Sequence, residues 1–122
     1  MNPDHYDKND IAQELAELRR IVIATDRRWL RKKQNVSILN NMNYDFGEEA
    51  VRLDWHQPDF RALREDIARA RKDVASGVVS GESALQLLAD LAEHTKEAVD
   101  ELDDIQVPHM SRVWAEEDRK AY

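Results

Sequence analysis

The chain has 122 residues, with 25 acidic and 18 basic side chains, a formal net charge of −7 and no cysteine. This length fits one domain, 1–122, and the 42% hydrophobic content is sufficient for a buried core. The absence of cysteine excludes disulfides, thiol nucleophiles and cysteinyl metal sites. No apolar stretch approaches the ~18 residues of a membrane span, and the polar N-terminus lacks the apolar core of a signal peptide. We therefore expect a cytoplasmic protein.

Charge is distributed unevenly along the chain. The run 19–33 contains seven basic residues and one acid, which sum to +6, whereas 82–104 contains eight acids and one base, which sum to −7. Both runs have helical periodicity, so the sequence predicts two oppositely charged helices in one small domain. Either these helices neutralise each other within the fold, or the basic run binds an acidic partner.

The first predicted helix begins after residues 7–9, whose side chains can cap its first turn. Its core positions recur at alternating spacings of four and three, the heptad pattern of a packed helix, with polar exceptions at Thr25 and Lys32. A continuous helix would be about 45–50 Å long at 1.5 Å per residue, so a break near Thr25 and Asp26 is the alternative. The seam consists of Ile11, Leu15, Leu18, Val22, Thr25, Trp29, Lys32, Val36 and Leu39.

Four further helices complete the predicted all-α fold, an antiparallel bundle of three long helices with two short additional ones. The first short helix follows a polar stretch, and Asp45 with Glu48 has the spacing of a capping box. Proline and glycine residues mark the ends of the two long helices that follow. The four expected helices are 46–54, 58–76, 81–107 and 111–121.

The second long helix carries sorted charges beside its apolar stripe. Asp59, Asp66 and Asp73 line one flank of this helix. Arg64 and Arg71 line the other. Because such flanks are where neighbouring helices exchange ion pairs, we expect the aspartates to face the basic helix and the arginines to face the acidic one. This internal pairing is the favoured interpretation of the opposed charges.

No arrangement of residues indicates catalysis, a cofactor or a metal, and the motifs identify no family. The three glycines are scattered, so no glycine-rich phosphate loop is present, and no serine has the nucleophile-elbow pattern. Asp90, His94, Glu97 and Glu101 share one face of the acidic helix. The paired Glu-x-x-His motifs of di-iron bundles are missing, however, so we interpret this face as solvated. We expect a protein that is not an enzyme and uses no cofactor.

The expected function is that of a non-catalytic protein-interaction module: an adaptor, an inhibitor or a small subunit that binds another protein or a second copy of itself. The expected surface is the outer face of the first helix, with two tryptophans at element ends as typical interface anchors. The alternative is a nucleic-acid-binding protein or subunit that uses the run 19–33, although the acidic total charge disfavours it. No membrane partner is expected. The expected binding residues are Arg20, Ile23, Arg27, Leu30, Arg31, Trp55 and Trp114.

Overall fold

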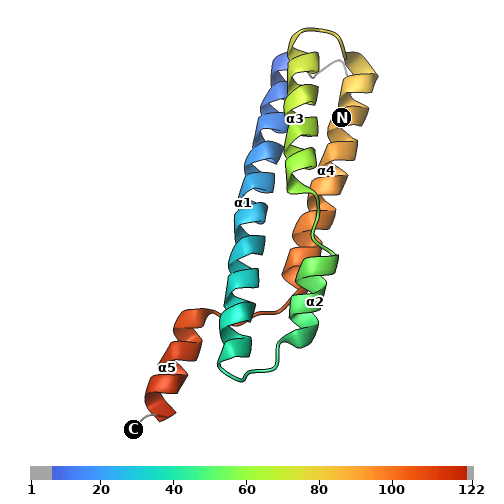
Figure 1. Ribbon diagram of the computed structural model, residues 1–122. Coiled ribbons are helices and arrows are strands. Elements are labelled where there is room, and N and C mark those ends of the chain that lie inside the picture. Colours follow the sequence, from blue (N-terminus) through green and yellow to red (C-terminus); the bar gives the residue numbers. More distant parts are fainter. Residues whose placement is uncertain (1–6, 121–122) are drawn as a thin grey trace. The chain divides into compact units, whose positions relative to one another are not determined.

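The computed structural model describes residues 7–120, which form five helices and no strand (Figure 1). This confirms the all-α prediction, including the three long helices and both short ones. Within the described part of the chain, no helix combines the length and the apolar character that crossing a membrane requires. The helices are α1 (Lys8–Asn41), α2 (Gly47–Trp55), α3 (Phe60–Ala75), α4 (Gly81–Asp104) and α5 (Met110–Lys120).

The described residues fall into two compact units. Unit 1 combines the residues up to Asp26 with Pro58–Asp100, and unit 2 combines Arg27–Gln57 with the residues from Glu101 onward. Helices α1 and α4 therefore each contribute their first part to unit 1 and their last part to unit 2. A single domain over 1–122 stays a prediction.

In unit 1, three helical segments lie side by side, and α3 runs antiparallel to both α1 and α4 (Figure 1). The heptad positions of the three helices supply its core, as the seam of the first helix predicts. Each large apolar side chain that is buried in this way contributes roughly 1.5–3 kcal/mol. The core residues are Ile11, Leu15, Val22, Phe60, Ile67, Ala70, Val74, Ala84, Leu91 and Ala98.

Helix α1 continues through Thr25, so the break that the sequence left open does not occur. Thr25 is buried, and its Oγ1 donates to the carbonyl of Ile21 at 2.6 Å. Thr95 on α4 is also buried and donates to the carbonyl of Leu91 at 2.8 Å. Because each hydroxyl bonds within its own helix, a threonine can occupy the core seam without an unsatisfied polar group.

Helices α2 and α3 differ in how their first turns are capped. Asp59 caps α3, and its side chain accepts from the Ala62 N–H at 3.0 Å. Helix α2 begins at Gly47, and its N-cap residue Phe46 makes no side-chain cap hydrogen bond. The Phe46 N–H instead donates to Oδ1 of Asn40 at 2.9 Å. The predicted capping box is wrong, because the N-cap is Phe46 and the Asp45 carboxylate accepts from the Gly47 N–H at 3.4 Å rather than from Glu48.

Unit 2 has two apolar centres. Trp29 is fully buried, and its Nε1 donates to the carbonyl of Leu53 at 2.9 Å, which joins α1 to α2. In the second centre, the first turn of α5 packs against the end of α1 and the loop that follows it. This second centre contains Leu39, Met110 and Val113, with Met42, Tyr44, Phe46 and Val107 partly buried around them.

Candidate protein-interaction surface

Several basic residues of the first helix have partners within unit 2. The Arg28 guanidinium lies 2.7 Å from a carboxylate oxygen of Asp103. The Lys33 amine lies 3.1 Å from Asp54 and donates to Gln57 at 2.9 Å. Such partly exposed ion pairs contribute roughly 0.2–1 kcal/mol each. They neutralise part of the basic run inside the fold.

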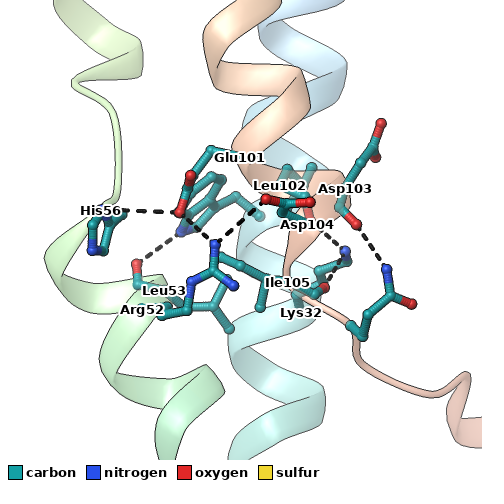
Figure 2. Close-up of polar contacts among 11 residues, drawn as sticks. Lys32, Arg52, Leu53, His56, Glu101, Leu102, Asp103, Asp104 and Ile105 are labelled. Carbon is teal, nitrogen blue, oxygen red and sulfur yellow. Dashed lines mark hydrogen bonds and ion pairs between the residues drawn. The ribbon is translucent and has the colours of Figure 1, made fainter.

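Lys32 shows why a charged residue occupies the core seam of α1. Its Nζ donates to the backbone carbonyls of Leu102 and Ile105, both at 2.7 Å, where α4 ends (Figure 2). The Leu102 carbonyl also accepts from the Ile105 N–H at 3.2 Å, so Lys32 is its second donor. A cation at this place also complements the helix dipole. Burial, and then the nearby Arg28, lowers the pKa of Lys32, while Asp103 opposes this shift. Lys32 therefore serves the fold and is not free for a ligand.

A second polar cluster joins α2 to the last turn of α4 (Figure 2). The Arg52 guanidinium lies 3.0 Å from Glu101 and 4.0 Å from Asp104. His56 Nδ1 lies 3.8 Å from the same oxygen of Glu101. These contacts orient α2. Among residues 7–120, no group of three or more histidine, aspartate or glutamate side chains is placed to hold a metal ion.

The sequence predicts that the aspartates of α3 face α1 and its arginines face α4, and this prediction is wrong. Arg64 lies 3.4 Å from Asp26 of α1, so it faces the basic helix rather than the acidic one. Asp66 and Asp73 instead line a groove with residues of α4, and Asp59 caps its own helix. The reason is that heptad flanks identify two sides of a helix. The handedness of the bundle decides which neighbour each side meets.

Arg27 and Arg31 have no ion-pair partner among the described residues. They lie one turn apart on the exposed side of α1 in unit 2, and Leu30 beside them is 49% exposed. Like charges at this spacing on a helix cost roughly 0.2–0.5 kcal/mol. We name Arg27, Leu30 and Arg31 the α1 basic face. Arg19 of the run, in unit 1, is also exposed and has no ion pair among the described residues. The α1 basic face is the unneutralised part of the run that lies in unit 2.

Two of the expected binding residues belong to unit 1. Arg20 is exposed and pairs with Glu17, one turn earlier on the same helix. Ile23 is half-buried. Arg20 is thus partly neutralised, which leaves the α1 basic face as the better-supported part of the expected surface.

Two tryptophans of unit 2 are exposed, unlike the buried Trp29. Trp55 at the end of α2 is 83% exposed, and Trp114 on α5 is 53% exposed. Val51 lies one turn before Trp55, opposite the buried Leu53, and is 55% exposed. We name Val51 and Trp55 the α2 outer face. Val51 is not among the binding residues expected from the sequence, although its spacing from Leu53 and Trp55 on a short helix places it on the outer side.

Comparison with known proteins gives no family for this chain. No family model matches the sequence, and neither curated proteins nor solved structures yield a match. Its function is therefore inferred from the surface that the described residues present.

Proposed function

We propose that this protein is a non-catalytic protein-interaction module that binds another protein through the α1 basic face, with the α2 outer face as a second contact. One observation carries the proposal. Arg27 and Arg31 have no ion-pair partner, whereas Arg28, Lys32 and Lys33 between and beside them all have polar partners in the fold. The uncompensated arginines are therefore available to a partner's acidic groups.

The chemistry of both faces fits protein recognition. Arginine and tryptophan are the residues most enriched among those that dominate binding energy at protein interfaces. An arginine can bind a carboxylate through two parallel hydrogen bonds, and an exposed leucine beside it gives the contact an apolar centre. A partner that presents carboxylates around an apolar side chain would fit the α1 basic face.

The alternative is nucleic-acid binding through the same arginines. Each phosphate contact on duplex DNA contributes about −0.9 to the slope of log affinity against log salt. The α1 basic face offers two arginines for such contacts, and the net charge of the chain is −7, which opposes binding to a polyanion. A protein partner is therefore the better-supported proposal.

Quantitative affinity capture from cell extract tests the proposed function. The bait proteins are the wild type, Arg27→Glu/Arg31→Glu, and the control Arg61→Glu/Lys72→Glu. Arg61 and Lys72 are exposed on α3. Each double variant replaces two cations with two carboxylates, so both change the net charge by the same amount. The wild type and the control should retain the same proteins, and the α1 variant should lose them by about tenfold or more, which corresponds to about 1.4 kcal/mol.

Equal capture by all three baits would contradict the proposed function. Loss of capture after nuclease treatment would instead support the nucleic-acid alternative. Circular dichroism of each variant checks that the helices are retained.

A further inference from the structure

Unit 1 has a groove of about 290 Å³ between α3 and α4. Its floor is apolar, and its walls carry carboxylates from both helices. We name it the acidic groove. Its residues used here are the floor residues Ala70, Leu87 and Leu91 and the wall residues Asp66, Asp73 and Asp90.

The fold leaves the acidic groove largely unneutralised. Among the described residues, Asp73 has no ion pair, and Asp90 accepts a hydrogen bond from Gln86 at 2.8 Å but has no cationic partner. Asp66 has one cation nearby, Arg69, at 3.8 Å on the same helix, and both side chains are more than half exposed. Three carboxylates around an apolar floor therefore face one arginine, and the imidazole of His94 also lines the groove.

We propose that the protein assembles with itself, and that the α1 basic face of one copy packs into the acidic groove of a second copy. This inference rests on the proposed function, because it takes the α1 basic face as the binding surface and names its partner. The arginines of the face meet the carboxylates of the groove, and Leu30 meets the apolar floor. The pairing that the sequence predicts between Asp66, Asp73 and the basic helix is then made between copies.

Charge complementarity favours a second copy as the occupant. The chemistry of the groove matches side chains that present cations beside an apolar group, and the α1 basic face has this composition. Along their helices, Arg27 and Arg31 are about 6 Å apart, and Asp66 and Asp73 are about 10.5 Å apart. Both arginines therefore fit within the length of one acidic wall.

The proposed contact is heterologous, since it joins two different surfaces. Each copy carries one basic face and one acidic groove. A copy whose α1 basic face is mutated can still bind through its acidic groove. A copy whose acidic groove is mutated can still bind through its α1 basic face. This property gives the contact a specific experimental signature.

Sedimentation of the full chain tests the self-assembly. At about 0.05 M salt, the average mass of the wild type should rise with protein concentration. At about 0.5 M salt, association should weaken by about tenfold or more, because ions then screen exposed charges over a few ångströms. The variants Arg27→Glu/Arg31→Glu and Asp66→Lys/Asp73→Lys should each remain monomeric, while the control Arg61→Glu/Lys72→Glu should associate as the wild type does.

Mixing the two non-associating variants is the decisive step. The Arg27→Glu/Arg31→Glu variant keeps its acidic groove, and the Asp66→Lys/Asp73→Lys variant keeps its basic face. The mixture should therefore regain complexes of two chains or more. A mixture that stays monomeric, or a groove variant that still associates alone, would overturn the pairing of face and groove. A wild type that is monomeric at low salt and millimolar concentration would overturn self-assembly. If capture of other proteins still depends on Arg27 and Arg31 in that case, the proposed function stands.

Discussion

The most informative stability test is the replacement of Lys32 by methionine. This change keeps the length and the apolar stem of the side chain but removes the ammonium group. The carbonyls of Leu102 and Ile105 then lose a donor that lies 2.7 Å from each of them. We expect Lys32→Met to destabilise unit 2, because both carbonyls lose a charge-assisted hydrogen bond, and the Leu102 carbonyl keeps only its bond from the Ile105 N–H.

The size of the effect follows from these two contacts. A hydrogen bond to a charged group contributes about 1.5–3 kcal/mol net, so the pair contributes about 3–6 kcal/mol. A cation at a helix C-terminus adds about 0.3–1 kcal/mol. Desolvation of the ammonium group, which also lowers the pKa of Lys32, offsets part of this sum. We therefore expect a net loss of about 2–3 kcal/mol.

Urea denaturation followed by circular dichroism measures the loss, and Lys33→Met is the matched control. Lys33 undergoes the same chemical change, but its ion pair with Asp54 is on the surface and contributes about 0.2–1 kcal/mol. With a slope of about 2 kcal/mol per molar urea, Lys32→Met should lower the midpoint by about 1 M or more. Equal midpoints for the two variants would refute the assignment of Lys32 as the cap of α4.

Three further predictions concern single residues. Trp29→Phe should cost about 2–4 kcal/mol in urea denaturation, since it leaves a void in a fully buried site and removes the bond to Leu53; no loss would contradict this packing. Thr25→Val should change the unfolding free energy by less than about 1 kcal/mol, because the hydroxyl bonds only to a carbonyl already paired in the helix; a larger loss would reveal another role. The hydrogen bond to Glu117 raises the pKa of Tyr44, so its stabilising effect is present below about pH 10 and is lost as pH rises through the raised value. Phenolate absorbance should show Glu117→Gln lowering the pKa of Tyr44, and an unchanged titration would contradict the contact.

Sequence periodicity predicted the five helices and the buried seam of α1, because both depend on patterns within one helix. The seam of α1 is buried as expected, with Leu18 and Lys32 half-buried. The polar exceptions Thr25 and Lys32 were identified, but not their partners. The partner of Lys32 is a pair of carbonyls about seventy residues away, and no local pattern encodes such a contact.

The direction of the charge flanks could not be predicted for a different reason. Periodicity places Arg64 and Asp66 on opposite sides of α3, as observed. Which side meets α1 depends on the handedness of the three-helix arrangement, and both hands satisfy the same heptad pattern. The contact between Arg64 and Asp26 shows which one this chain adopts. It also leaves Asp66 and Asp73 free to form the acidic groove.

Site-specific photo-crosslinking tests the central claim, that the exposed side of α1 in unit 2 binds protein, most directly. A photoreactive phenylalanine derivative replaces Gln34, which is exposed one turn beyond the α1 basic face, or Val78, which is 75% exposed in the turn before α4. After irradiation in cell extract, position 34 should give discrete cross-linked species that contain a second polypeptide, either another protein or a second copy. Position 78 should give none. Cross-linking from position 78 without cross-linking from position 34 would contradict the account.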